Sequence, residues 1–248
     1  MAQEGIYKNP IMLNQVTHKT VKIAQVVNFS FARDLNSVLV TGHEFMEASK
    51  HYPIVFVSGQ NDDIVPLVIL GLRDKGNLFI DDEGKWKKGA YIPAFIRRYP
   101  FILSENESGG QNFAVSVDAA YEGFDQEEGM PLFDEEGNSS KDLERVVEFL
   151  KQFQMQNMLT QEFVKKLTEY NLLKDFAADI TMPAGEKLGF RGMKMINEKA
   201  LLELEDDKAL ELFRRGFLGW IYGHLYSLSN FRALGASEAK KASAGQAV

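Results

Sequence analysis

The strongest β-sheet signal in the chain is the segment IVFVSGQNDDIVPLVIL, residues 54–70. It contains two apolar runs, Ile54 to Val57 and Ile64 to Leu70, joined by a loop that holds Gly59 and several aspartates. Two such runs joined by a loop of this composition predict a β-hairpin. Because both runs are almost continuously apolar rather than alternating, we expect strands that are covered on both faces.

The rest of the first half extends this β-rich pattern. Phe113 to Asp118 alternates with period two and predicts a strand, whereas Gly42 to Lys50 predicts a short helix. Tyr91 to Leu103 contains Pro93 and Pro100, each of which lacks a backbone donor. We therefore expect an edge strand or an extended loop with turns there.

Helical periodicity begins after a polar break at Asp125 to Gly129. Ser139 is a candidate helix cap, and the apolar stripe that follows it predicts one helix. A second helix is expected from Thr160 to about Asn171. The glycine- and proline-broken stretch from Ala178 to Met195 predicts a returning hairpin.

The C-terminal region is expected to end in one long helix from about Asp206 to Phe231. Residues Gly235 to Val248 show no apolar periodicity and are expected to form a mobile tail. The predicted fold class is α+β, in one domain over residues 1–234. Its β-rich part covers about residues 7–120 and its helical part about residues 139–232.

Composition excludes several classes of function. The 248-residue chain has a formal net charge of −7 and its Lys and Arg residues are scattered, which argues against nucleic acid as a partner. The absence of cysteine removes disulfides, thiolate nucleophiles and zinc–thiolate sites. No glycine pattern for ATP, NAD or flavin is present, so no cofactor is expected.

The N-terminus, MAQEGIYKNP, lacks a basic region followed by an apolar stretch, and we therefore expect a cytoplasmic location. A membrane span needs about 20 consecutive apolar residues. The longest apolar stretches, residues 64–72 and 217–222, are far shorter. No membrane span is predicted.

Several phrases occur in a fixed order along the chain and together resemble the SapC family over roughly residues 7–232. The most specific is YIPAFIRRYPF, residues 91–101. The resemblance implies an association with surface-layer protein loci, and it carries no catalytic residue set. The other phrases are Pro10 with Leu13-Asn14 and His18, Phe31-Ala32 with Leu35-Asn36, Tyr52 to Phe56, Gly71-Leu72 with Asn77 to Phe79, Pro131 to Asp134, and His224 to Asn230.

Arg97 and Arg98 are the first candidate ligand-binding residues. An arginine fork pairs bidentately with a carboxylate, and Tyr99 or Phe95 is placed to stack on it. Adjacent residues of a strand point to opposite faces, so at most one of the two would face a ligand. The alternative is that one arginine forms a structural ion pair with an Asp or Glu while the other is solvated.

His224 is the second candidate, because it lies on the predicted inner face of the last helix with Asn230 nearby. The alternative is a neutral core histidine held by one hydrogen bond. His43 and His51 are eight residues apart, which is not the spacing of a helical zinc site, so no metal site is predicted.

Three functions remain open from the sequence. The first is a non-enzymatic binding protein that captures a peptide or protein connected with the cell surface, by strand addition at Tyr91 to Phe101. The second is an enzyme acting on an amino-acid-like or peptide substrate through His224, an acidic partner and Arg97 or Arg98. The third is a structural subunit. The glycines at positions 216, 219 and 223 allow close helix approach and are consistent with a homodimer.

Overall fold

The computed structural model describes residues 5–59, 63–105, 113–181, 185 and 187–245. The strands are β1 (Pro10–Met12), β2 (Lys22–Ile23), β3 (Ser37–Leu39), β4 (Ile54–Ser58), β5 (Ile64–Ile69), β6 (Phe101–Glu105), β7 (Phe113–Asp118), β8 (Met130–Pro131), β9 (Leu173–Thr181) and β10 (Lys187–Ile196). The α-helices are α1 (Phe45–Ala48), α2 (Ala94–Arg97), α3 (Lys141–Glu169), α4 (Glu198–Leu202), α5 (Asp206–Arg214), α6 (Phe217–Ser227) and α7 (Asn230–Gly245), and two 3₁₀ turns, η1 (Ser30–Ala32) and η2 (Gly42–Glu44), complete them.

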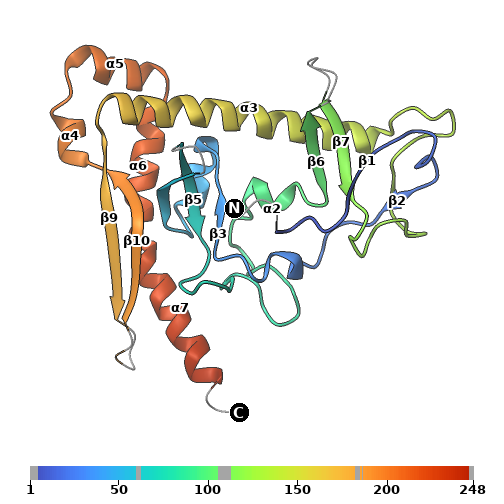
Figure 1. Cartoon of the computed structure of the whole chain (residues 1–248), viewed down its shortest axis with the longest axis horizontal. Coiled ribbons are helices and arrows are strands. Elements are labelled where there is room, and N and C mark those ends of the chain that lie inside the picture. The colour runs from blue at the N-terminus through green and yellow to red at the C-terminus, as the bar shows by residue number, and fades with distance from the viewer. Residues whose placement is uncertain (1–4, 60–62, 106–112, 182–184, 186, 246–248) are drawn as a thin grey trace.

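The larger sheet has five antiparallel strands in the order β3-β5-β4-β10-β9 and lies towards one end of the molecule (Figure 1). The β4–β5 hairpin predicted from the sequence is confirmed, with Ile54 opposite Val68 and Ser58 opposite Ile64. The hairpin predicted between Ala178 and Met195 is also confirmed, as β9 and β10. Because β10 pairs with β4, strands from the C-terminal half complete a sheet that begins in the N-terminal half.

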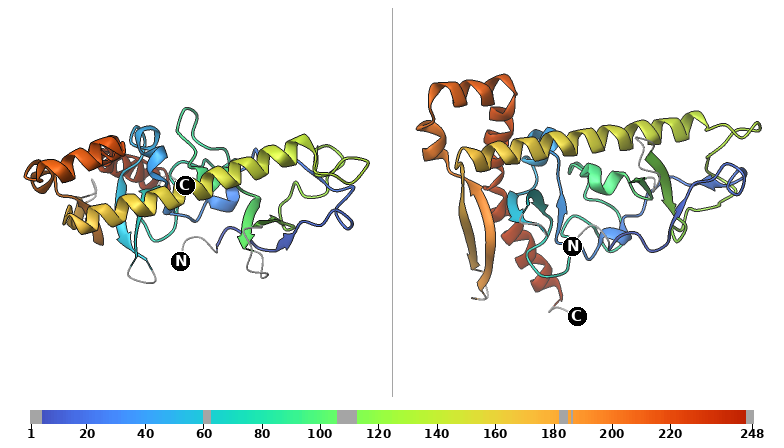
Figure 2. Two further views of the ribbon diagram at one scale, coloured as in Figure 1. Left: turned by 90° about the horizontal axis from the view of Figure 1, so that it is seen from above. Right: turned by 45° about the horizontal axis from the view of Figure 1, so that its top comes forward.

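A second sheet of three strands, in the order β1-β7-β6, lies at the other end of the molecule (Figures 1 and 2). The strand predicted at Phe113 to Asp118 is β7. The remaining pair, β2 with β8, lies beside this sheet. The α+β class is therefore correct, with sheets in the N-terminal half and a mostly helical C-terminal half.

The two helices predicted between residues 139 and 171 are one continuous helix, α3, which runs along one edge of the whole molecule (Figure 2). Ser140 rather than Ser139 caps it, and its side chain accepts a hydrogen bond from the Leu143 amide. Thr160 lies inside this helix rather than at a helix start, and its hydroxyl links α3 to η2. It donates to the Gln156 carbonyl at 2.6 Å and accepts from the Gly42 amide at 2.8 Å.

The long C-terminal helix predicted from Asp206 to Phe231 is divided into α5, α6 and the start of α7. Gly216 separates α5 from α6, since its φ of 75° lies in the left-handed region that ends helices. The tail predicted from Gly235 is also corrected, because α7 continues to Gly245. Glu238 in this helix is buried and forms an ion pair with Arg73 at 2.7 Å. Residues 246–248 lie outside the described residues.

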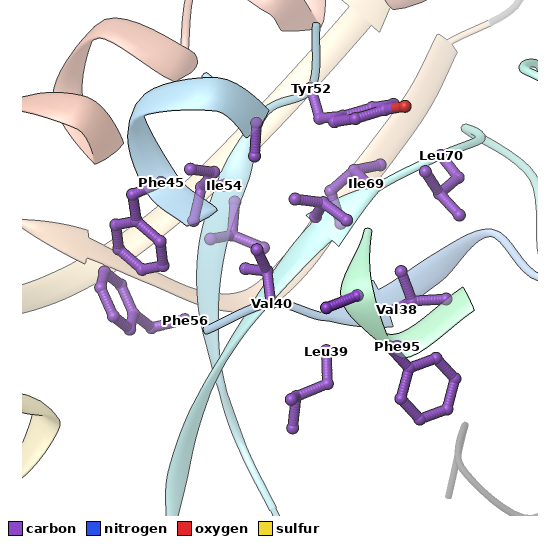
Figure 3. Packing of buried hydrophobic residues seen from close by; sticks show 14 of the residues in the cluster. Val38, Leu39, Val40, Phe45, Tyr52, Ile54, Phe56, Ile69, Leu70 and Phe95 are labelled. Atoms are coloured by element: carbon purple, nitrogen blue, oxygen red, sulfur yellow. The ribbon is translucent and has the colours of Figure 1, made fainter. Parts of the chain in front are cut away.

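The main core lies between the five-stranded sheet and the helices that cover it. Figure 3 shows the rings of Phe45 and Phe56 side by side, and Phe95 of α2 beside Val38 of β3. A smaller apolar cluster joins the three-stranded sheet to the first turns of α3, through Leu143 and Leu150 among others. No helix in the described part of the chain is long and apolar enough to cross a bilayer.

Candidate functional site

The edge strand expected at Tyr91 to Leu103 is found only at its end, where β6 lies at the edge of the three-stranded sheet, and the residues before β6 form a turn instead. Ala94–Arg97 forms one helical turn, a cis peptide bond joins Tyr99 to Pro100, and β6 begins at Phe101. Pro93 precedes the turn, where its missing N–H leaves no helical hydrogen bond unmade. The turn before β6 is largely buried, so that part of the segment offers no edge for strand addition.

A buried carboxylate from a distant part of the chain holds this turn. Glu44 Oε1 accepts hydrogen bonds from the Ala94 amide at 2.7 Å and from the Tyr91 hydroxyl at 2.9 Å. Its Oε2 accepts from the amide and the hydroxyl of Thr41. With four donors, this carboxylate has no acceptor capacity left for a ligand. The Thr41-x-x-Glu44 capping box is a sequence signal that identifies Glu44 as a structural residue.

Neither Arg97 nor Arg98 forms an ion pair with a carboxylate among the described residues, so the structural ion pair considered as the alternative is not found there. Arg97 is exposed, and it donates to the Ile92 carbonyl at 3.0 Å and to the Tyr91 hydroxyl at 3.1 Å. The guanidinium of Arg98 lies 4.3 Å from the ring centre of Phe95 and is largely buried. Burial lowers the pKa of Arg98. Both guanidinium groups lie over aromatic rings, and that of Arg97 also bonds to the backbone.

His224 is fully buried and forms part of a structural clamp, defined here as His224, Ser227 and Asn230. Its Nε2 accepts a hydrogen bond from the Ile196 amide at 3.1 Å, which places the ring proton on Nδ1. Burial lowers the pKa of His224 from 6.5 to about 3, so the ring is neutral at physiological pH. Among the described residues no carboxylate or arginine contacts this ring, so the catalytic interpretation of His224 has no acidic partner and no carboxylate anchor there.

The other two clamp residues also bond to backbone. Ser227 Oγ accepts from the Ile54 amide at 2.9 Å, at the first residue of β4. The amide nitrogen of Asn230 donates to the carbonyls of Ser49 and Tyr52, at 2.6 and 3.1 Å. The clamp therefore fastens α6 and α7 to the ends of α1, β4 and β10.

Tyr99, a predicted site residue, borders an open aromatic cavity. Its hydroxyl donates to Asp118 Oδ2 at 3.3 Å, and its ring is stacked on Phe31 with centroids 4.0 Å apart. The ring of Tyr121 stands edge-on to it at 5.5 Å. These three rings, Phe31, Tyr99 and Tyr121, line a cavity of about 450 Å³, which we call the aromatic groove.

Polar groups of several kinds complete the aromatic groove. The amide side chains of Gln25, Asn28 and Gln126 line it, together with one cation, Lys8, and one carboxylate, Glu122. Pockets that bind organic ligands combine apolar walls with a few polar groups in this way. The nearly balanced charge favours a ligand without a large net charge.

An extended piece of chain, Gln25–Asn28, runs along the aromatic groove and is called the open segment here. It continues without turn or bend between Ala24, whose amide donates to the Gly123 carbonyl, and Phe29, whose amide donates to the Gly84 carbonyl. Within the described residues, no backbone N–H or C=O of the open segment forms a hydrogen bond. Val26 is half-buried while Val27 is 71% exposed, as expected for an extended chain.

The open segment was missed by the sequence analysis. Its Val26-Val27 pair is typical of strands, and that signal was available. The lack of a pairing strand is a property of the tertiary structure, which short-range patterns do not contain. Among the described residues, no three His, Asp or Glu side chains gather as metal ligands would.

Comparison with known proteins supports one assignment. No curated protein and no solved structure matches the chain significantly. The SapC family model matches residues 13–234, which is most of the chain. The chain therefore belongs to the SapC family.

Proposed function

We propose that the protein binds an extended peptide by strand addition along the open segment. The observation that carries this proposal is that four consecutive residues, Gln25–Asn28, keep their backbone groups free of intramolecular hydrogen bonds beside the aromatic groove. A strand edge of this kind is a template for pairing with another chain.

The backbone bonds alone would give weak binding. In an extended chain, alternate residues point both their N–H and their C=O to the same side, so four residues offer up to about four hydrogen bonds on one edge. At roughly 1 kcal/mol net for each bond, they supply about 4 kcal/mol, whereas a micromolar complex needs about 8 kcal/mol.

A side chain in the aromatic groove supplies the remainder. Burying an aromatic side chain of 150–250 Å² contributes roughly 4–6 kcal/mol at about 25 cal/mol per Å². The entropy of association and of peptide ordering offsets part of this sum. The expected ligand is therefore an extended segment with an aromatic or large apolar residue, bound with a micromolar or weaker dissociation constant.

The source that we propose for the peptide rests on the resemblance to the SapC family. SapC proteins are associated with surface-layer protein loci, and a surface protein is accordingly the partner that we propose. An enzymatic function receives no comparable support, because His224 and the two arginines lie at separate places and are bonded internally.

Two proline variants test the proposal. Neighbouring residues of an extended chain point their N–H groups to opposite sides, so Val26→Pro and Val27→Pro remove donors from opposite edges. Binding of extended peptides of about ten residues with a central Phe is measured by fluorescence polarisation against matched peptides with a central Ala. We expect one proline variant to lose binding at least about tenfold and the other to retain it.

The matched control is Val27→Thr, which keeps the N–H and the β-branched shape. It should bind within about twofold of the wild type. Retained binding in both proline variants would contradict strand addition. Equal binding of the Phe and Ala peptides would contradict the role of the aromatic groove.

A further inference from the structure

A second cavity, of about 280 Å³, lies on another part of the surface and is basic. It is lined by residues that follow α1, by the loop at residues 87–90 and by the first half of α7. Lys50, His51, Lys87 and Lys88 line it, and no carboxylate is among its lining residues. In a chain with 35 acidic and 28 basic residues, such a local excess of cations is unexpected from composition.

The lysines of this basic pocket differ in how far they are neutralised. Lys50 is paired with Glu47 at 2.7 Å. Lys87 lies 5.5 Å from the ring centre of Phe79 and has no carboxylate partner in the described residues. Lys88 is exposed and forms neither an ion pair nor a hydrogen bond within the described part of the chain. Two positive charges at the pocket thus remain uncompensated.

Backbone donors add to these charges. The Ala90 amide donates to the Lys87 carbonyl at 3.0 Å, and Gly89 has a φ of 80°, so residues 87–90 form a tight turn. In the described structure, the amides of Lys88 and Gly89 donate to no other group. Successive free N–H groups in such a turn form a concavity that suits anions.

We propose that the basic pocket binds the phosphate group of a small phosphorylated molecule. A phosphate monoester carries close to two negative charges and three terminal oxygens, which match two uncompensated lysines and two neighbouring N–H groups. A carboxylate offers one charge and two oxygens, and would leave part of this set unused. Ser237 and Asn230 also line the pocket and add polar atoms beside the lysines.

His51 supplies a reporter inside the pocket. Burial and the nearby Lys50 lower its pKa, Lys87 lowers it further, and Glu47 opposes them. A bound dianion would favour the imidazolium and raise that pKa. The four histidines of the chain make its ring signals assignable by NMR through substitution.

The test is an NMR titration of the full chain with inorganic phosphate and, separately, with glycerol 3-phosphate. We expect saturable shifts of the His51 ring signals, a rise in its pKa, and tighter binding of glycerol 3-phosphate than of inorganic phosphate. Lys87→Gln combined with Lys88→Gln should weaken binding by at least about tenfold. Lys85→Gln is the matched control, because Lys85 lies near the same turn but is paired with Glu83 at 2.5 Å, and it should change binding less than about twofold.

Three outcomes would overturn the inference. They are the absence of His51 shifts at about 10 mM phosphate, equal weakening by the Lys85 control, and unchanged binding in the double variant. Sedimentation with phosphatidic acid vesicles, in the absence of any response to the two soluble phosphates, would assign the pocket to a membrane surface instead.

Discussion

The structural clamp and the open segment use backbone hydrogen bonds in opposite ways. His224, Ser227 and Asn230 bond to four backbone groups at the ends of other elements and lie in or near the core. The backbone of Gln25–Asn28 bonds to nothing within the described structure and lies at the surface. A polar sequence motif with several candidate catalytic residues can therefore be structural, while the segment proposed to bind a peptide has no such motif.

The clamp and the open segment differ because the clamp lies at buried ends of helices and strands, whereas the open segment lies at the surface. A strand or helix leaves unpaired N–H and C=O groups at its termini, and a buried one must find a partner for them. Ile54 begins β4 and Ile196 ends β10, and the clamp supplies a hydrogen-bond acceptor for the amide of each. The open segment is exposed, so water or another chain can form hydrogen bonds with its backbone groups.

Among the variants considered, His224→Ala should lower the stability of the protein most. The substitution removes a fully buried ring and leaves the Ile196 amide without an acceptor, so we expect a loss of roughly 3 kcal/mol or more in the free energy of unfolding. Urea denaturation measures it. The control is Tyr226→Ala on the same helix, where a 78% exposed side chain should matter by less than about 0.5 kcal/mol. A loss below about 1 kcal/mol for His224→Ala would show that the clamp is dispensable.

Acid should lower the stability of the protein because His224 in the clamp is buried in its neutral form. The pKa of His224 is about 3 in the folded protein and 6.5 in the unfolded chain, so acidification below pH 6.5 protonates the unfolded state first. Stability is therefore lost as the pH falls from 6.5 towards 3, by up to about 1.4 kcal/mol per pH unit. Comparing unfolding free energies at several pH values for wild type and His224→Gln isolates this contribution. Parallel pH profiles for the two proteins would contradict a neutral buried His224.

Ser227→Ala should cost less, about 1–2 kcal/mol, because it leaves one buried N–H, that of Ile54, without its acceptor. Chemical denaturation again gives the value. Ser229→Ala is the matched control, since this exposed hydroxyl bonds only to the Tyr226 carbonyl and its loss should be nearly neutral. Equal losses in both variants would argue against a special role for Ser227.

Val27→Pro in the open segment should change stability least. Val27→Pro removes an N–H that has no internal partner, so stability should change by less than about 0.5 kcal/mol even if peptide binding is lost. Proline at Val55, in the middle of β4, is the contrasting variant and should cost about 3 kcal/mol or more. Thermal unfolding distinguishes the two, and a strong loss in Val27→Pro would mean that the open segment is part of the folded framework.

Local patterns were sufficient for elements whose partners are near in the chain. The β4–β5 and β9–β10 hairpins, and the apolar stripe at the start of α3, were predictable because turn chemistry and periodicity act over short distances. The inward position of His224 on its helix was likewise predictable, although its partner, Ile196, was not.

Contacts between residues far apart in the sequence explain why several predictions were wrong. The turn α2 depends on Glu44, which precedes Ala94 by 50 positions and bonds to its amide. Thr160 resembles a helix start in the sequence, yet its hydroxyl bonds to Gly42 on another element. Gly216 was interpreted as a residue for close helix approach, whereas its left-handed conformation ends α5. Each case requires knowledge of what lies opposite a residue in space.

Helix α3 couples the two sheets mechanically. Its 29 residues span roughly 44 Å at 1.5 Å per residue. Leu143 and Leu150 are anchored in the smaller apolar cluster, while Phe163 and Leu167 are anchored in the main core. A rigid rod fixed at both ends cannot tilt at one without moving the other. A load applied to the three-stranded sheet is therefore borne by the five-stranded sheet as well.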